Sequence, residues 1–407
     1  MLPFDEAQRR LVSSVAPVDA ERVGIFEADG RVLAEDIVAP WSLPSFDHSS
    51  MDGYAVRTAE LGGAPPHRLP VRGTSAAGGP IAAAPSDGAV RIYTGAPLPI
   101  GMDAVIMQED VTATDVGGVP FISFDTQPAP SAWIRRRGDD LAEGSIALAK
   151  GRRLSPGSVA LAAALNRASL LVARRPVVTI LGTGDELRTP GDPPRESSVV
   201  ESNGFFVASA ARRVGAIARL GPFVRDDPDA ARDAVKAALA GTDLLVTIGG
   251  VSVGDRDFVR PALEAAGVSI EFYKVAMKPG KPLTVGRHGR TLVLGLPGNP
   301  ASASLTFLLF GVPVLRAMMA ELDPLPSPRK LRVEGRLSRK PGRTEFARAR
   351  LLRDDAGDYA TLLPNQASGA VTSFAEADAL AVIDASRGDF QGPDTLEVIA
   401  VSDILKT

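Results

Sequence analysis

The chain has 407 residues, of which 45% are hydrophobic and 23% charged, and its formal net charge is −3. A chain of this length is too long to fold around one ordinary hydrophobic core, so we expect a globular protein of roughly two to four domains. The near-neutral charge and the few aromatic residues give no footprint for nucleic acid, and the absence of cysteine excludes disulfides, thiolate metal sites and cysteine nucleophiles.

The start of the chain shows no signal for secretion or membrane insertion. The stretch MLPFDEAQRRLVSSV lacks the basic and then apolar order of a signal peptide. No apolar run approaches the roughly 18 residues that a membrane span requires. We therefore expect a cytoplasmic protein that has neither a membrane nor a nucleic acid as a partner.

The first part of the chain reads as a small domain interrupted by a β-rich insertion. FDEAQRRLVSSV predicts a helix, RVLAEDIVAP a short strand, and Ser155 followed by Pro156 the start of a second helix. Between these elements, short β-type runs such as AVRIYTG and DAVIMQEDV alternate with Gly/Pro turns. We assign a mixed linking domain to residues 1–42 and 141–174, and an inserted, mostly β domain to residues 43–140.

The middle of the chain alternates strand and helix patterns. Apolar runs such as PVVTILG, DLLVTIGG and TLVLGL are separated by helical patterns, among them SNGFFVASAARRVG and DPDAARDAVKAALAG. The last helical pattern is NPASASLTFLLFGVPVLRAMM. This alternation predicts a doubly wound, mainly parallel α/β sheet in residues 175–324.

The last part of the chain reads as a separate β domain. The Pro-rich stretch DPLPSPRK is typical of a linker, and LRVEGRLSR, EFARARLL and DTLEVIAVS beyond it alternate apolar and polar residues. The pattern predicts a small antiparallel barrel or sandwich. We assign a C-terminal antiparallel β-barrel domain to residues 325–407.

Four loops are candidates for the site, because ligands of a parallel α/β sheet bind beyond the carboxyl ends of its strands. They are LGTGDEL, RDDP, GGVSVGDRD and GLPGNPAS. In RDDP, we expect Asp227 to cap a helix whose first residue is Pro228, and we favour this structural role for the loop over a functional one. Asp226 then lies at the end of the preceding strand. In GGVSVGDRD, three glycines with Asp255 and Asp257 exceed what a turn requires, since glycines let a phosphate approach free N–H groups.

Missing motifs exclude several classes of enzyme. GGVSVGD lacks the Lys-Ser/Thr ending of a Walker motif, and GTGDEL lacks the third glycine of a dinucleotide fingerprint. His48, His67 and His288 have no zinc-ligand spacing, and no G-x-S-x-G elbow supports Ser-His-Asp catalysis. What is left is a pocket for an anion and a hard cation such as Mg²⁺, with helix starts, including Asn299 as an N-cap, facing the anion.

Three lysines supply positive charge to such a pocket. Lys274, Lys278 and Lys281 surround a Pro-Gly turn in KVAMKPGKPLTVG, between runs that read as buried strand. A lysine trio on a buried rim needs an anionic partner, although lysines at a turn are often only solvated. In the insertion, SFDHSSMDGYAVR, RIYTGAPLP and IRRRGDDL are each compatible with a plain turn or solvated loop as well as with a functional contact.

The chain carries eight ordered motifs that resemble those of one family. SSMDGYAV, TGAPLPIGMDAVIMQED, RRRGDD, GTGDEL, ESN, GGVSVGDRDF, VAMKPGKP and GLPGNPAS are similar to motifs of the molybdopterin molybdenumtransferase (MoeA) family. The C-terminal part of gephyrin is also similar to this family. The resemblance covers nearly the whole chain and includes RTEFARA and QASGAVTS near its end.

This resemblance implies an elongated four-domain homodimer that makes the molybdenum cofactor. The α/β domain would be a MogA-like molybdopterin-binding domain, similar to the pterin adenylyltransferases, one of which would act upstream. The implied reaction takes adenylylated molybdopterin and molybdate, cleaves the phosphoanhydride with Mg²⁺, releases AMP and inserts molybdenum at the dithiolene. The insertion with MDGYA would reach toward the site of the partner subunit.

The resemblance also implies roles for particular residues. The positions that we expect to be catalytic are Asp52, Thr94, Asp140, Glu186, Asp226, Asp257, Lys274 and Lys278. The positions that match the molybdate pocket are Lys278, Lys281, Ser302, Arg343 and Ser368. The expected pterin or phosphate contacts are Gly249, Gly250, Ser252, Gly254, Pro297 and Pro300. The expected Mg²⁺ ligands, each at the end of a strand, are Asp226 and Asp257.

The sequence also departs from the family pattern at a few positions. Gly182 and Ile248 stand where the family often has serine, and Val200-Glu201 replaces an aromatic-Asp pair. These changes affect the fine placement of substrate and remove no charged site residue. A gephyrin-like dimeric scaffold, a tungsten-inserting paralogue and a relative that performs only the adenylylation are the alternatives. The scaffold would tolerate loss of the pocket residues, whereas the whole charged set is present here.

Overall fold

The computed structural model describes residues 1–225, 227–250 and 259–406. The chain divides into two compact units. The first consists of Met1–Glu35, Lys150–Ala160 and Arg167–Thr407, and the second of Asp36–Ala149 and Leu161–Asn166. The finer division into four domains stays a prediction.

The first unit contains a six-stranded sheet in the order β16-β13-β17-β21-β20-β18. Four strands run parallel to one another: β16 (Ile217–Leu220), β13 (Val177–Gly182), β17 (Leu244–Ile248) and β21 (Thr291–Leu296). The other two are antiparallel to their neighbours: β20 (Pro282–His288) and β18 (Ser269–Lys274). The predicted mainly parallel sheet is confirmed. The edge is antiparallel because a two-residue turn, Gly289–Arg290, joins β20 directly to β21.

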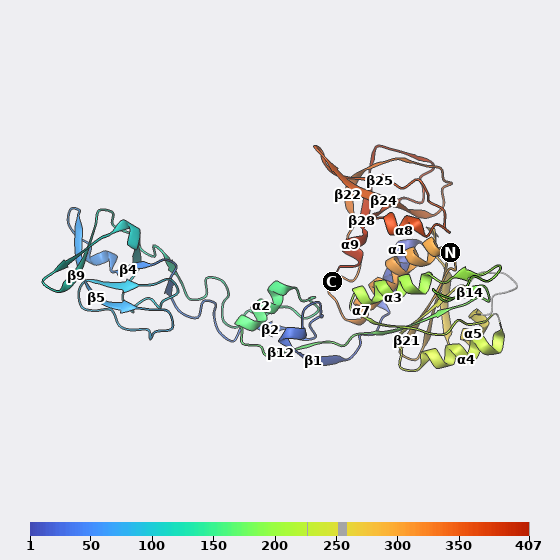
Figure 1. Cartoon of the computed structure of the whole chain (residues 1–407), viewed down its shortest axis with the longest axis horizontal. Coiled ribbons are helices and arrows are strands. Elements are labelled where there is room, and N and C mark those ends of the chain that lie inside the picture. Colours follow the sequence, from blue (N-terminus) through green and yellow to red (C-terminus); the bar gives the residue numbers. More distant parts are fainter. Residues whose placement is uncertain (226, 251–258, 407) are drawn as a thin grey trace. The chain divides into compact units, whose positions relative to one another are not determined.

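Helices cover both faces of this sheet (Figure 1). On one face lie α4 (Pro228–Leu239) and α5 (Val259–Ala265), and their buried residues form one hydrophobic cluster with the sheet. On the other lie α1 (Phe4–Ser13), α3 (Asn203–Arg213) and a continuous helical run made of α6 (Pro300–Thr306), a π-helical turn (Phe307–Gly311) and α7 (Val312–Met318). All five residues of β17 are buried, as expected for a strand covered on both faces.

The helical run Pro300–Met318 forms the centre of the larger hydrophobic cluster. It is long and apolar enough to cross a membrane, so the expectation that no run reaches that length was wrong. However, 94% of its most apolar window is buried inside the protein. A helix that is apolar on all sides is typical of the buried core of a protein, and this one packs between the α/β sheet and other elements of the same hydrophobic cluster.

A second sheet in the same unit closes into the predicted barrel. Its strands follow one another in the order β24 (Thr344–Asp354), β25 (Gly357–Leu362), β22 (Arg329–Glu334), β28 (Asp394–Ala400) and β26 (Ala379–Ile383), and β26 pairs back with β24. The barrel differs from a purely antiparallel one in a single detail, because β22 and β25 are parallel. Two short helices accompany it, α8 (Thr372–Glu376) and α9 (Val401–Ile404), with a small pair formed by β23 (Arg336–Leu337) and β27 (Phe390–Gln391).

The predicted linking segments form smaller elements than their patterns suggest. RVLAEDIVAP contains only β2 (Ile37–Val38), which pairs with β11 (Ile146–Leu148). The run that begins at Ser155 divides into α2 (Pro156–Ala164) and β12 (Ser169–Ala173), and β12 pairs with β1 (Ala20–Gly24). Ser155 starts α2 as predicted, since its Oγ accepts a hydrogen bond from the Ser158 N–H at 3.3 Å.

The second unit contains the predicted β-rich insertion. Its six-stranded sheet has the order β7 (Ala104–Met107), β4 (Gly53–Val56), β6 (Ala89–Ile92), β5 (His67–Ser75), β9 (Val119–Phe124) and β8 (Thr112–Val116). All pairs are antiparallel except β5 with β6. A two-stranded ladder joins β3 (His48–Ser49) to β10 (Ile134–Arg135).

Asp243 links the amino ends of β13 and β17 through hydrogen bonds, and we expect its substitution to change stability in a pH-dependent way. Its carboxylate accepts two hydrogen bonds from Arg174, at 2.7 and 2.6 Å, and one from the Val177 N–H at 2.8 Å. Burial raises the pKa of Asp243, but the bonds from Arg174 and Val177 outweigh burial and hold the pKa below its usual value. A lowered pKa means that the ionised group stabilises the fold above its unfolded pKa, and that this contribution is lost as the pH falls toward the folded pKa.

We therefore expect Asp243→Asn to lower the free energy of unfolding by about 1–3 kcal/mol at pH 7. The deficit should shrink as the pH falls below about 5, because the unfolded chain takes up the proton first and the folded carboxylate only at its lowered pKa. Urea denaturation at several pH values measures both effects. Asp233→Asn, which removes a carboxylate from the exposed pair with Arg232, is the control and should change stability little at any pH. An equal loss at pH 7 and pH 3 would contradict the prediction.

Candidate functional site

A cavity of about 500 Å³ lies at the carboxyl ends of β13, β17 and β21. This is the position expected for a ligand of a parallel α/β sheet, and the volume suits a small-molecule ligand. The loops that leave the three strands form most of its wall, with Gly182–Gly184, Ile248–Gly250 and Pro297–Asn299. Its other lining residues are Glu186, Leu187, Glu201, Asn203 and Pro282.

Two adjacent glycines form one side of the cavity. Gly249 and Gly250 have φ angles of +90° and +60°, which L residues with a side chain rarely adopt. A Cβ on Gly249 would lie 2.8 Å from Thr183 Oγ1 and 3.0 Å from the Thr183 carbonyl oxygen. The two loops therefore approach each other as closely as they do because this position carries no side chain.

The amino ends of two helices face the same cavity. Asn203 begins α3, and its Nδ2 donates a hydrogen bond to the Gly298 carbonyl at 2.7 Å. Asn299 occupies the predicted N-cap position of α6, but its side chain makes no capping bond and instead donates to Ser368 Oγ at 3.3 Å. Helix amino ends carry free N–H groups and partial positive charge, so they favour an anionic ligand.

Two carboxylates line the cavity beside these helix ends. The Glu186 side chain folds over Gly184, where an added Cβ would collide with its carboxylate. Glu201 is buried, and its Oε1 accepts a hydrogen bond from the Gly204 N–H at 2.6 Å, at the start of α3. The sequence interpretation named Glu186 but missed Glu201, Asn203 and Thr183. An acidic residue and an asparagine directly before a helix, in the stretch ESN, were the available signal.

The lysine stretch crosses from one sheet to the other. After β18 the chain forms β19 (Met277–Lys278), which pairs in parallel with β24 of the barrel, and it then returns to the α/β sheet as β20. Lys278 Nζ lies 3.0 Å from Glu345 Oε1, and the Lys278 side chain is 40% exposed. A protein carboxylate is therefore an anionic partner of this lysine. Lys281 is exposed and directly precedes Pro282, a residue that lines the cavity. Pro282 lies opposite Lys274 in the ladder between β18 and β20.

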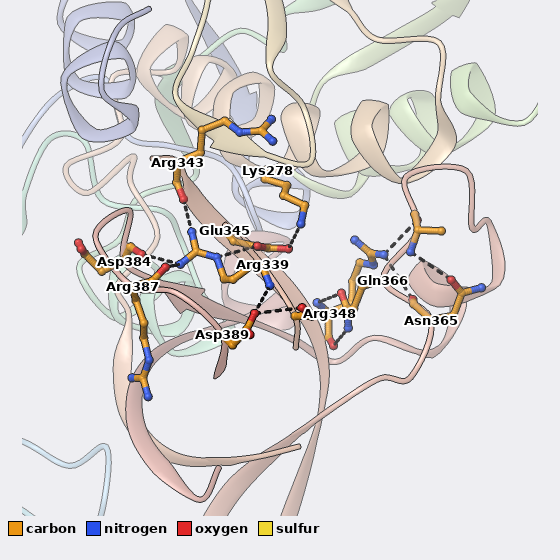
Figure 2. A network of polar contacts seen from close by, with 12 residues as sticks. Lys278, Arg339, Arg343, Glu345, Arg348, Asn365, Gln366, Asp384, Arg387 and Asp389 are labelled. Carbon is orange, nitrogen blue, oxygen red and sulfur yellow. Dashed lines mark hydrogen bonds and ion pairs between the residues drawn. The ribbon is translucent and has the colours of Figure 1, made fainter. Parts of the chain in front are cut away.

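The barrel brings Ser368 to the start of α6. The Ser368 carbonyl accepts a hydrogen bond from the Ala301 N–H at 2.9 Å, next to the buried Ser302. Its loop is held by Arg348, a fully buried side chain that donates to the Asn365 and Ala367 carbonyls at 3.3 and 3.1 Å (Figure 2).

The structure places the other predicted residues of the first unit around the same helix start and barrel edge. Pro297 lines the cavity, and Pro300 is the first residue of α6. The Arg343 carbonyl accepts a hydrogen bond from Arg339, while the Arg343 guanidinium extends away from Arg339 (Figure 2).

The second unit contains three of the residues predicted to be catalytic. Asp52 Oδ1 accepts hydrogen bonds from the Thr94 N–H at 2.7 Å and the Thr94 hydroxyl at 2.8 Å. These bonds, with the nearby charge of Arg91, lower the pKa of Asp52. Asp140 is exposed.

The arginine run beside Asp140 is tied to protein carboxylates. Arg136 donates to Asp47 at 2.6 Å, and Arg137 pairs with Glu143 at 2.7 Å. The structure therefore favours a structural role for these two arginines over the phosphate contact.

Four of the predicted site residues, Asp226, Ser252, Gly254 and Asp257, lie outside the described residues. Within residues 1–225, 227–250 and 259–406, no group of three or more His, Asp and Glu side chains could hold a metal ion. The assignment of Asp226 and Asp257 as metal ligands stays a prediction.

Three family models match successive parts of the chain. They describe the MoeA N-terminal region (domain I and II), over residues 2–166, a probable molybdopterin binding domain, over 179–317, and the MoeA C-terminal region (domain IV), over 330–401. A molybdopterin molybdenumtransferase of Haemophilus influenzae is 35% identical over 403 residues, which cover 98% of each chain. The chain belongs to the MoeA family.

Other MoeA proteins support the same assignment. Molybdopterin molybdenumtransferase 2 of Mycobacterium tuberculosis is 38% identical over 366 residues, covering 88% of this chain and 89% of the relative. The crystal structure of a MoeA molybdopterin biosynthesis protein from Pyrococcus horikoshii superposes with a TM-score of 0.83 at 26% identity, covering 98% of this chain and 100% of the other. The cavity of this MoeA protein is formed by the strands and loops that the molybdopterin-binding model covers.

Proposed function

We propose that this chain inserts molybdenum, supplied as molybdate, into adenylylated molybdopterin and releases AMP. The observation that carries the proposal is the cavity at the ends of β13, β17 and β21, which combines two helix amino ends with two carboxylates. The helix ends suit the phosphates of the substrate. The family and the names of its curated relatives supply the molybdenum transfer.

The molybdate position is the part of the proposal that involves both sheets. Ser368 from the barrel contacts the start of α6 beside Ser302, while Lys278 lies at the barrel edge. Molybdate is a tetrahedral dianion, and ammonium groups, hydroxyls and free N–H groups are suitable donors to its oxygens. We assign Lys278, Lys281, Ser302, Arg343 and Ser368 to its binding.

The donor set of the cavity is compatible with Mg²⁺. Glu186 and Glu201 both line it, and Mg²⁺ is commonly held by one or two carboxylates together with water and substrate phosphates. When bound, Mg²⁺ would supply charge neutralisation at the phosphoanhydride. The protein groups would orient the phosphates through helix N–H groups and hold the carboxylates that face the cation.

Asp52 and Thr94 extend the proposal to a homodimer. They form a hydrogen-bonded pair in the second compact unit, whereas the cavity belongs to the first. We infer, on the MoeA resemblance, that this pair serves the site of the partner subunit. A pterin adenylyltransferase would supply the substrate upstream.

Turnover by the purified chain tests the proposed function. We expect AMP release from adenylylated molybdopterin that requires Mg²⁺ and is stimulated by molybdate. Tungstate, supplied in parallel, separates the molybdenum enzyme from a tungsten-inserting paralogue, which would respond to tungstate alone. AMP release that is indifferent to both oxyanions, or no AMP release with a substrate that a related MoeA enzyme accepts, would contradict the proposal.

A further inference from the structure

Backbone pairing between β19 and β24 places Lys278 beside the barrel. In the parallel ladder between β19 and β24, Met277 lies opposite Thr344 and Lys278 opposite Glu345. The Thr344 N–H also donates to the Ala276 carbonyl at 3.1 Å. The register therefore places the Glu345 carboxylate beside the ammonium group of Lys278, 3.0 Å away.

Glu345 is a buried carboxylate that serves two cations, one at each oxygen. Its side chain is 4% exposed, with Oε1 paired to Lys278 and Oε2 accepting from Arg339 Nε at 2.9 Å. The Arg339 side chain is only 1% exposed. A carboxylate buried to this degree is costly unless its charge is compensated, and the buried guanidinium of Arg339 supplies that compensation. Lys278, on the more exposed side, supplies the second charge.

Arg339 is itself held by a set of backbone carbonyls (Figure 2). Its Nη1 donates to the Asp384 carbonyl at 2.9 Å and to the Arg387 carbonyl, and its Nη2 donates to the Arg343 carbonyl. Its backbone N–H donates to Asp389 Oδ1 at 2.7 Å. One buried guanidinium thus ties together the carboxylate that holds Lys278 and the backbone that carries Arg343.

We propose that Glu345 is a positioning residue that orients Lys278 toward the oxyanion, and that Arg339 acts behind it by holding the Glu345 carboxylate and the backbone at Arg343. This inference rests on the proposed function, which places Lys278 and Arg343 at molybdate. It adds that the barrel sets the direction of a lysine that belongs to the α/β domain. The ammonium group has three N–H donors, so one bond to Glu345 leaves two for the oxyanion.

A competing interpretation is that the Arg339–Glu345 pair only stabilises the barrel. Glu345→Gln separates the two interpretations, because an amide has one acceptor oxygen where the carboxylate has two. Because Lys278 and Arg339 lie at different oxygens of Glu345, the amide places an NH2 group opposite one of them. The buried guanidinium of Arg339 retains the acceptor, so Lys278 loses its fixed direction. The electrostatic effect has the opposite sign, since removing a negative charge beside Lys278 would by itself strengthen the binding of an anion.

The test measures molybdate binding to the full chain by isothermal titration calorimetry. We expect Glu345→Gln to weaken binding about tenfold in the wild-type background. In the Lys278→Ala background it should not weaken binding, because only the electrostatic effect of the lost negative charge is left. Glu321→Gln is the matched control, because Glu321 forms another buried ion pair, with Arg153, that does not include Lys278. It should leave binding unchanged.

A second readout does not depend on the proposed function. Acetylation of lysines with acetic anhydride, quantified by mass spectrometry, should modify Lys278 several-fold faster in Glu345→Gln, because the ion pair no longer holds the amine. Lys281 in the same molecule is the internal reference. If Glu345→Gln does not fold, Glu345→Asp replaces it: the shorter carboxylate keeps its charge but withdraws from one cation, and we expect changes of the same direction and smaller size.

The outcomes separate the two proposals. Weaker binding that disappears in the Lys278→Ala background, with faster acetylation of Lys278, supports the positioning role. Unchanged or tighter binding in Glu345→Gln, or an equal loss in both backgrounds, overturns it even if wild-type turnover succeeds. If wild type neither binds molybdate nor releases AMP, the proposed function fails, and unchanged Lys278 acetylation in Glu345→Gln would then overturn the positioning role independently.

Discussion

Lys278→Ala is expected to reduce molybdate-dependent AMP release by at least about 100-fold, the usual effect of removing one preorganised donor from the site of a developing charge. The fold should survive the change. Glu345 keeps Arg339 as its buried partner, and the Lys278 side chain is 40% exposed, so its ion pair contributes about 1 kcal/mol or less.

Single-turnover assays and thermal unfolding of the same preparations measure these two effects. Lys236→Ala, which removes an exposed lysine from α4, is the control and should leave both quantities unchanged. Full turnover by Lys278→Ala would show that this lysine does not bind the oxyanion. A large loss of stability would show instead that its main role is to compensate Glu345.

Gly249→Ala is expected to distort the wall of the cavity and to reduce kcat/KM for the pterin substrate by about 100-fold or more. The added methyl group would lie 2.8 Å from Thr183 Oγ1 and 3.0 Å from the Thr183 carbonyl, so the loops after β13 and β17 must separate. A one-ångström displacement of groups that position a substrate is enough for an effect of this order. The φ of +90° adds backbone strain of roughly 1–3 kcal/mol.

Gly241→Ala separates the effect of backbone strain from the effect of a distorted cavity wall. Gly241 precedes the same strand, β17, at its opposite end and has a φ of +64°, but an added Cβ would meet no atom within 4 Å. It should therefore lose stability and keep kcat/KM. Comparable kcat/KM values for the two variants would show that the close approach of Gly249 to Thr183 has no role in substrate binding.

Local patterns were sufficient for most of the α/β sheet. The apolar runs that became β13, β17 and β21 are bounded by glycine and are buried over most of their length, so composition and spacing identify them directly. The capping role of Asp227 was also predicted, and its carboxylate accepts a hydrogen bond from the Ala230 N–H at 2.7 Å. The antiparallel edge was missed because the two-residue turn at Gly289–Arg290 was not recognised as a hairpin signal.

The sequence by itself determined which loops carry the glycines, carboxylates and helix starts of the site, because those features depend on neighbours in the chain. Only the tertiary structure decided that Asn299 donates to Ser368 and that Lys278 meets Glu345. Each of these contacts joins the α/β domain to the barrel. No periodicity or local propensity relates segments so far apart in sequence. These contacts form only when β19 pairs with β24 at the barrel edge and the loop that carries Ser368 packs on α6.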